Sequence, residues 1–278
     1  MNCRPSFGAL LVGVLFGAAL WMSPATSMAQ ASTELRFNPV VDGSVAGGAT
    51  LLWILGETAG RSWFAPTACR WCEPPGFDAS ARSLRWSNQE AAQVSGSLTA
   101  SVGAPVSAFG LTWLAAAVDG RGREEIENAV LIAEAVGITM MLNNIVKWSV
   151  ARARPAVHFQ QGNWESFAES ERNLSFFSAH SSFSFSLAVA SGTIASMRGY
   201  RLAPLVWAVG LPMAAFTAYS RVAGDAHYLS DVLIGSAFGA AMGFLIPYLF
   251  HRPTDSTVES ATMMPLVTGS TVGVSGSF

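Results

Sequence analysis

The residues best suited to chemistry lie in the stretch Ser220–Asp231. His227 and Asp231 are four residues apart, so a helix running through both would place them on one face. A carboxylate in that position accepts a hydrogen bond from one imidazole nitrogen and leaves the other free to act as a nucleophile. Arg221, just upstream, offers a planar pair of donors that suits oxyanions. The stretch predicts a histidine nucleophile, an orienting carboxylate and an anion-binding group at the start of an apolar helix.

A second cluster is formed by Lys147 and Arg154, which lie seven residues apart and therefore about 10 Å along a helix axis. Pro155 ends that helix. Charges at the end of an apolar helix are costly unless they are paired or functional. Snorkelling to the membrane interface accounts for one such residue, but two on the same stripe fit an anion site better.

The third cluster, Ser178-Ala179-His180, opens the next helical run. The first N–H groups of a helix are unpaired and attract phosphate. Ser178 serves either as a helix cap or as an anion ligand. His180, which comes before an apolar run, is placed to act as a general acid, with a structural histidine as the alternative.

The three clusters together resemble the motifs of the type-2 phosphatidic acid phosphatase and vanadium haloperoxidase superfamily. The first motif of that family is Lys, six residues, Arg-Pro, and it is matched here from Lys147 to Pro155. The third is Ser-Arg, five residues, His, three residues, Asp, and it is matched from Ser220 to Asp231. The second is usually Pro-Ser-Gly-His, but Phe177 and Ala179 replace its Pro and Gly. The resemblance covers about residues 85–250.

The resemblance implies an all-α fold, an apolar helical bundle of the acid phosphatase and haloperoxidase type, with a metal-free site that cleaves phosphomonoesters or diphosphates. It implies that His227 attacks phosphorus and forms a phosphohistidine, that Asp231 orients it, and that His180 protonates the leaving oxygen. The groups implied to hold the phosphate are Lys147, Arg154, Ser178, Ala179 and Arg221. Phosphoryl transfer gains mainly from positioning and from charge stabilisation on the phosphate oxygens. Three cations supply that charge without a cofactor.

The composition indicates membrane helices or an unusually apolar helical bundle. Of the 278 residues, 51% are hydrophobic and only 12% are charged, whereas a soluble domain has about 25% charged residues. The mean hydropathy is +0.37, and the net charge of −2 gives no electrostatic basis for binding nucleic acid. We expect about five or six membrane-associated helices.

The chain divides into four expected parts. These are a signal peptide or uncleaved signal anchor (1–29), an N-terminal segment with a peripheral helix and a disulfide loop (30–87), the helical-bundle domain (88–252) and a polar tail (253–278). Within the second part, Gly43–Ala59 is short and glycine-rich, and we expect it to be peripheral or re-entrant. In the tail, Val267–Val272 predicts a small hairpin, with a disordered tail as the alternative.

Cys69 and Cys72 form the pattern Cys-Arg-Trp-Cys. A zinc site needs four ligands, and no second pair of cysteines is available. A thioredoxin-like motif requires a βαβ context, which the sequence lacks. In an oxidising compartment we therefore expect a structural disulfide.

Basic residues predict the orientation of the helices. Those in or beside the short connections are Arg121, Arg123, Arg198, Arg201 and Arg252, and cytoplasmic loops are typically basic. This distribution places Lys147, His180 and His227 together on the periplasmic face of a bacterial inner membrane.

Three other polar residues allow simpler interpretations. Arg152 is expected at the surface or against a lipid headgroup. Glu134 lies in an apolar run, where a buried acid is a functional candidate by default, although packing against Ser or Thr also explains it. His251 lies at a helix end, where its charge would complement the helix dipole.

The leading hypothesis is an integral membrane phosphatase that acts on a lipid phosphate or diphosphate such as phosphatidic acid, phosphatidylglycerol phosphate, a prenyl diphosphate or lipid A phosphate. One alternative is a soluble, broad-specificity periplasmic acid phosphatase. Another is a haloperoxidase with vanadate as cofactor in the phosphate site. The last is a non-catalytic membrane protein that binds anions. The sequence indicates no oligomeric state.

Overall fold

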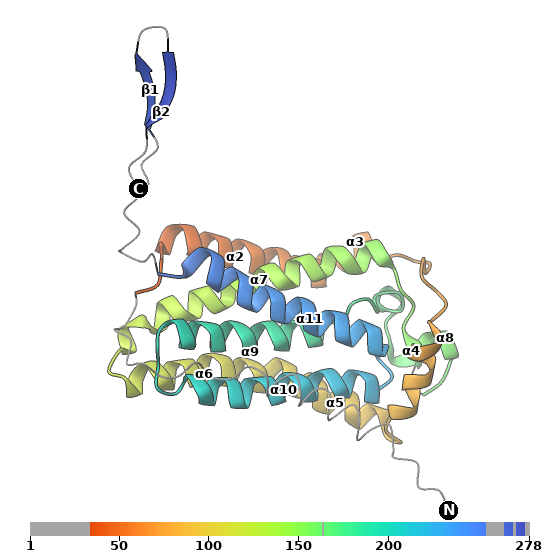
Figure 1. Cartoon of the computed structure of the whole chain (residues 1–278). Coiled ribbons are helices and arrows are strands. Elements are labelled where there is room, and N and C mark those ends of the chain that lie inside the picture. Colours follow the sequence, from red (N-terminus) through yellow and green to blue (C-terminus); the bar gives the residue numbers. More distant parts are fainter. Residues whose placement is uncertain (1–33, 163, 254–263, 269–270, 276–278) are drawn as a thin grey trace, which may run out of the picture.

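The long helical segments run side by side along the bundle (Figure 1). The structure is a computed structural model that describes residues 34–162, 164–253, 264–268 and 271–275. The long segments are α2 (Pro39–Leu55) with η1 (Gly56–Gly60) and α3 (Arg61–Phe64), α5 (Gln89–Leu98) with η3 (Thr99–Gly103) and α6 (Ala104–Val118), α7 (Glu125–Val150), α9 (Ala179–Met197), α10 (Ala203–Ala223), and α11 (Leu229–Ile246) with η7 (Pro247–His251). The short helices are α4 (Gly76–Ala81), η2 (Arg82–Leu84), η4 (Gly122–Glu124), α8 (Pro155–Phe159), η5 (Trp164–Ser166) and η6 (Glu169–Glu171). The expected apolar helical bundle is confirmed.

Five of the long segments have the length and composition of membrane spans. They are Pro39–Phe64, Gln89–Val118, Gly122–Val150, Ala203–Ala223 and Leu229–His251. Large apolar side chains such as Leu51 and Phe250 are exposed on the outside of the bundle, as expected where lipid replaces water. The chain is therefore a membrane protein, which argues against the soluble alternative.

The first span differs from the expected peripheral helix. The glycine-rich stretch Gly43–Ala59 does not end at Ala59, because π-helical η1 leads directly into α3 and the helix continues to Phe64. The complete segment of 26 residues is long enough to cross a membrane.

Helix α9 is the central element and packs against α6, α7, α10 and α11. Its contact with α11 is close because α11 presents glycines to serines of α9. A Cβ on Gly235 would lie 2.7 Å from the carbonyl oxygen of Ser178, and one on Gly243 would lie 2.7 Å from that of Ser186. Small residues that let two helix backbones approach are a common packing device in membranes. This contact fixes the starts of α9 and α11 relative to each other.

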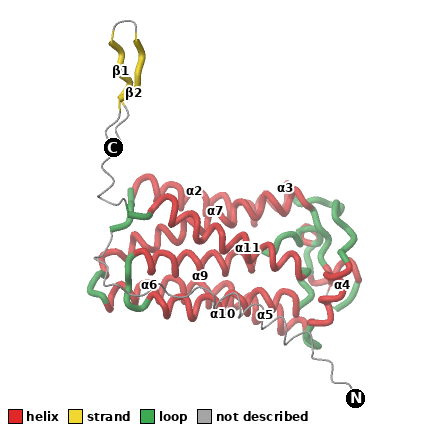
Figure 2. Tube along the Cα trace, viewed as in Figure 1, coloured by secondary structure: helices red, strands yellow, loops and turns green. Residues whose placement is uncertain are grey.

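Loops gather at the two ends of the bundle (Figure 2). At the loop-rich end, residues 65–88, 151–178 and 224–228 connect the helices. The opposite end, called here the arginine end, holds ion pairs such as Arg198 with Glu127 at 2.6 Å and Arg201 with Asp119 at 2.5 Å. The bundle thus separates the basic connections from the predicted site residues, as the sequence suggested.

The tail contains a two-stranded antiparallel hairpin. Strands β1 (Met264–Thr268) and β2 (Thr271–Ser275) pair with Met264 opposite Ser275. This agrees with the hairpin predicted around Val267–Val272. The predicted signal segment, 1–29, lies outside the described residues.

Candidate active site

The predicted site residues meet at the loop-rich end, although they come from five separate parts of the chain. They are Lys147 in the last turn of α7, Arg154 before α8, Ser178, Ala179 and His180 at the start of α9, Arg221 in the last turn of α10, and His227 and Asp231 around the start of α11. His180 interacts electrostatically with Arg221 and His227. It also interacts with Lys147 and Arg154. The convergence expected from the sequence is therefore present in the fold.

The ring of His227 is buried and held in one tautomer. Its side chain is almost fully covered, and Nδ1 lies 2.8 Å from the carbonyl oxygen of Ser175. A carbonyl only accepts, so Nδ1 carries the proton and Nε2 keeps its lone pair. Burial, followed by the nearby charges of Arg154, Arg221 and Lys147, lowers the pKa of His227 well below its ordinary value. The imidazole is neutral at neutral pH, as a nucleophile must be.

The relation between His227 and Asp231 differs from the prediction. Helix α11 begins at Leu229, so His227 precedes it and does not share a helix face with Asp231. Asp231 Oδ2 lies 3.7 Å from His227 Nδ1. It accepts hydrogen bonds instead from the Ser175 hydroxyl at 2.5 Å and the Tyr228 amide at 2.9 Å. Asp231 thus orients His227 indirectly, by fixing the residue whose carbonyl holds the ring.

Arg152 takes part in the same network, and the expectation of a surface position was wrong. Its side chain is 1% exposed. The guanidinium pairs with Asp231 through Nη1 and with Asp78 through Nη2 at 2.7 Å. Its Cζ also lies 3.8 Å from the ring centroid of Trp71 and 4.2 Å from that of Tyr228. Arg152 therefore clamps the carboxylate of Asp231 from the side opposite Ser175 and Tyr228.

Arg154 lies within hydrogen-bond distance of the unprotonated nitrogen of His227. Its Nη1 lies 3.3 Å from His227 Nε2. The guanidinium is fixed by hydrogen bonds to the carbonyl oxygens of Glu171 and Ala226, both at 2.9 Å. An anion held by Arg154 is consequently placed against the histidine lone pair.

Two further buried cations have donors to spare. Arg221 uses Nη1 on the Ser97 hydroxyl at 3.1 Å, while its buried Nε has no hydrogen-bond partner among the described residues. Lys147 is 5% exposed. Within residues 34–162 and 164–253, no hydrogen bond or ion pair engages its ammonium group. Unclaimed charge of this kind, buried beside a nucleophile, is suited to a phosphate.

The start of α9 supplies the second motif. The Ser178 hydroxyl caps the helix by accepting from the Ser181 amide at 3.4 Å, and the Ser178 amide donates to the Asp231 carbonyl at 3.0 Å. Of the two roles expected for Ser178, its contacts in the structure are those of a helix cap. The N–H groups of Ala179 and His180 belong to the first turn and have no acceptor within the helix. They remain suited to an anion.

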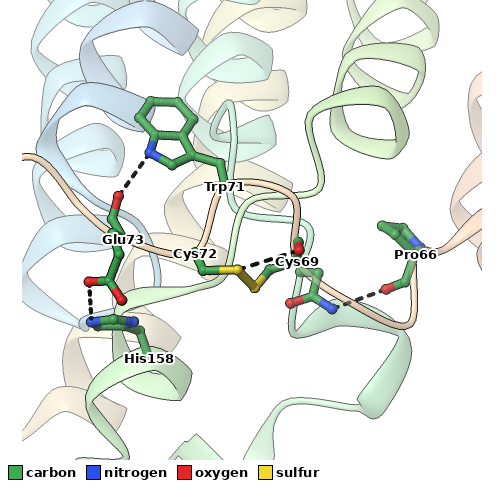
Figure 3. The surroundings of a disulfide bond; sticks show 7 residues. Pro66, Cys69, Trp71, Cys72, Glu73 and His158 are labelled. Atoms are coloured by element: carbon green, nitrogen blue, oxygen red, sulfur yellow. Dashed lines mark hydrogen bonds and ion pairs between the residues drawn. A yellow bond between two sulfur atoms is a disulfide. The ribbon is translucent and has the colours of Figure 1, made fainter.

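Cys69 and Cys72 form a disulfide in the loop that follows α3 (Figure 3). The loop is joined to the site because the Ala153 amide donates to the Trp71 carbonyl at 3.2 Å. The disulfide loop thus places the Trp71 ring against Arg152.

His158 takes no part in the site. Its Nε2 lies 3.8 Å from the carboxylate of Glu73, beside the disulfide loop (Figure 3). Its ring packs edge-on against Phe159. His158 lies within short helix α8, and these contacts are those of a structural histidine.

Residues 128–255 match the family model of the PAP2 superfamily. The match covers less than half of the chain, and it shows what this part of the chain is similar to. Two curated relatives are called lipid A 1-phosphatase. The protein of Rhizobium johnstonii is 34% identical over 120 residues, which is 40% of this chain and 43% of the relative. That of Porphyromonas gingivalis is 26% identical over 140 residues, 48% of this chain and 28% of the relative. The alignments thus span less than half the length of either relative, and no solved structure matches the chain.

The PAP2 segment contains every predicted phosphate-site residue, as well as Arg152 and Ser175. Asp78, Trp71 and the disulfide lie before it. The part of the chain that precedes the PAP2 segment therefore completes the second layer of contacts around the candidate nucleophile.

Proposed function

We propose that this protein is a phosphatase that hydrolyses lipid phosphates or diphosphates through a phosphohistidine on His227, without a metal ion in the reaction. The observation that carries the proposal is the pair His227 Nε2 and Arg154 Nη1, which face each other across 3.3 Å at a buried, neutral imidazole. An oxyanion bound to Arg154 would bring its phosphorus to the lone pair. The similarity to the PAP2 superfamily and the names of the two relatives support the same class of reaction.

In the first step, His227 Nε2 attacks phosphorus, a P–N bond forms, and the P–O bond to the lipid breaks. The imidazole becomes positively charged. Its Nδ1–H remains on the carbonyl of Ser175, with the carboxylate of Asp231 at 3.7 Å. Both groups stabilise that charge. His180, in its protonated form, gives its proton to the leaving oxygen.

In the second step, His180 accepts a proton from water, the water oxygen attacks phosphorus, and the P–N bond breaks. This returns His227 to its neutral form and releases inorganic phosphate. Lys147, Arg154 and Arg221 neutralise the equatorial oxygens in both steps. Three fixed cations perform the charge stabilisation that other phosphoryl-transfer enzymes obtain from Mg²⁺.

The proposed substrate is the 1-phosphate of a lipid A-type glycolipid. The relatives' names motivate this choice. The site lies at the loop-rich end of a bundle with membrane-length helices, so a headgroup phosphate reaches it while the acyl chains stay in the bilayer. Arginines at the opposite end are typical of cytoplasmic connections, and this supports a site that faces the periplasm.

The test is phosphate release by the purified full-length protein in detergent, with Mg²⁺ omitted and EDTA present. The panel holds lipid A 1-phosphate, phosphatidic acid, phosphatidylglycerol phosphate, a prenyl diphosphate and a soluble aryl phosphate. We expect release from lipid A 1-phosphate and none by His227→Ala. A turnover that requires Mg²⁺, or that survives in His227→Ala, would contradict the mechanism. A preference for another lipid would overturn the substrate alone.

A further inference from the structure

A second cluster of chemically capable side chains lies at the arginine end, away from the candidate active site. Asp42 of α2, Glu134 of α7 and His251 of η7 each offer a ligand atom, and these atoms lie within 4.8 Å of one another. The three side chains come from three separate helical segments and are all buried, with residue exposures of 9%, 6% and 3%. The proposed reaction uses none of them.

The hydrogen bonding of His251 leaves its second nitrogen facing a carboxylate. Nδ1 lies 3.0 Å from the carbonyl oxygen of Arg36, which only accepts, so Nδ1 carries a proton. Nε2 lies 3.2 Å from Oε2 of Glu134. Neither of these two buried atoms makes a hydrogen bond with the described residues. If the ring is neutral, the lone pair of His251 Nε2 faces a lone pair of Glu134 Oε2. This is unfavourable unless a cation or a proton lies between the two atoms.

The spacing between His251 Nε2 and Glu134 Oε2 fits a metal ion, whereas Asp42 Oδ2 lies 4.0 Å from the other ring nitrogen, Nδ1. Two ligands bound at about 2.0 Å to a tetrahedral ion stand about 3.3 Å apart, close to the 3.2 Å between His251 Nε2 and Glu134 Oε2. A backbone carbonyl that accepts from the other imidazole nitrogen, as Arg36 does here, is the usual outer partner of a metal-bound histidine.

The charge balance points the same way. Two carboxylates carry a net charge of −2 beside a neutral imidazole, or −1 beside a protonated one, in a segment of membrane-length helices. Within the described residues, His251 is the sole basic side chain paired with Asp42 or Glu134. Buried charges without compensation are strongly unfavourable. A divalent cation would neutralise the cluster.

The cluster is also open to solvent on one side. A cavity of about 400 Å³ is lined by Asp42 and His251. Its other lining residues are Arg36, Phe37, Asn38, Leu249 and Phe250. The cavity provides an entry path and room for a water molecule as a fourth ligand. Asp42 Oδ2 also accepts a hydrogen bond from the backbone N–H of Asn38 at 2.7 Å.

We propose that Asp42, Glu134 and His251 bind one divalent cation of the zinc class, which ties the start of α2 and the end of α11 to α7. The ion is structural, because it lies at the end of the bundle opposite His227. Its presence or absence is independent of the proposed phosphatase activity.

The proposal is tested by metal binding to the full-length protein in detergent. The protein is stripped with EDTA, dialysed and titrated with Zn²⁺ by calorimetry, and separately with Co²⁺, whose visible absorption reports tetrahedral coordination. We expect one ion per chain. Removal of an outer partner lowers metal affinity about 10- to 100-fold. His251→Ala and Glu134→Gln remove a ligand and should lower it by more than that. His158→Gln is the matched control and should bind as the wild type does.

Thermal unfolding provides a second measurement. Zn²⁺ should raise the melting temperature of the wild type and of His158→Gln, because an ion that binds only the folded state stabilises it. Asp42→Asn, at the edge of the cavity, should show a reduced shift even if the two more buried variants fail to fold. If the wild type binds no ion in a one-to-one ratio, or if all three variants still bind it, the proposal is overturned in favour of a metal-free ion pair between His251 and Glu134.

Discussion

Replacing Arg152 tests how the candidate nucleophile is held in place. The guanidinium is 1% exposed and lies between the carboxylates of Asp78 and Asp231, whose side chains are fully buried. Arg152→Ala leaves both acids without their shared counter-charge. Breaking a buried ion pair from one side costs about 3–5 kcal/mol of folding free energy. Arg152→Lys keeps the charge but lacks the planar fork that reaches both acids, so we expect an intermediate loss.

The kinetic effect should fall on kcat. The phosphate-binding cations stay in place, whereas the carboxylate that fixes Ser175 loses its clamp, and a displacement of about 1 Å lowers the rate about 100-fold. The assay is initial phosphate release below the unfolding temperature, together with thermal unfolding. Arg201→Ala is the matched control, since this arginine is 72% exposed in its pair with Asp119 at the arginine end and such pairs contribute about 0–1 kcal/mol. If Arg152→Ala matches Arg201→Ala in kcat and melting temperature, the clamp has no positioning role.

Three further perturbations address other parts of the site. As the pH falls below about 6.5, His227 takes up a proton in the unfolded chain but not yet in the folded one. The free energy of unfolding should therefore decrease as the pH is lowered, and it should decrease less in His227→Asn. The measurement is the melting temperature as a function of pH; equal slopes for the wild type and His227→Asn would contradict the lowered pKa. Reducing the bond between Cys69 and Cys72 should remove about 2 kcal/mol of stability from its four-residue loop and lower kcat. Unchanged melting and turnover under reductant would show that the loop does not support the site. Gly235→Ala should abolish turnover because its Cβ would lie 2.7 Å from the start of α9, whereas Gly110→Ala, with open space at that position, should not; equal activities would refute the close helix contact.

The residues that the sequence predicted most readily are those whose types alone suggest chemistry. Lys147, Arg154 and Arg221 are cations beside apolar helices, and such charges in a membrane protein point to function. The basic connections then placed the helix ends that carry Lys147, His180 and His227 on the same face. Their convergence follows from the alternating direction of consecutive spans, which helix lengths and loop positions reveal.

The orientation of His227 could not be obtained in this way. The spacing of His227 and Asp231 suggested a shared helix face, but Asp231 accepts from the Tyr228 amide and helps to start α11 after His227. A carboxylate three residues after a helix cap is a known start signal, so this cue was present in the sequence. The partner that fixes the ring is a backbone carbonyl of Ser175. Any residue carries a carbonyl, so residue type gives no hint of it.

Arg152 and the first span were missed for different reasons. The burial of Arg152 depends on Asp78, 74 positions earlier in the chain, and a single sequence does not reveal that two such residues meet. The segment from Pro39 was underestimated because its glycines suggested a short helix, whereas η1 and α3 continue it without a break.

The most direct test of the account is a search for the covalent intermediate. Protein incubated briefly with substrate carrying labelled phosphate is quenched in base, where phosphohistidine survives, and the labelled peptide is identified by mass spectrometry. We predict label on His227, none in His227→Ala, and acid-labile phosphoenzyme in His180→Ala with a substrate whose leaving group needs no proton. Label on another residue, or full turnover by His227→Ala, would contradict the proposed nucleophile.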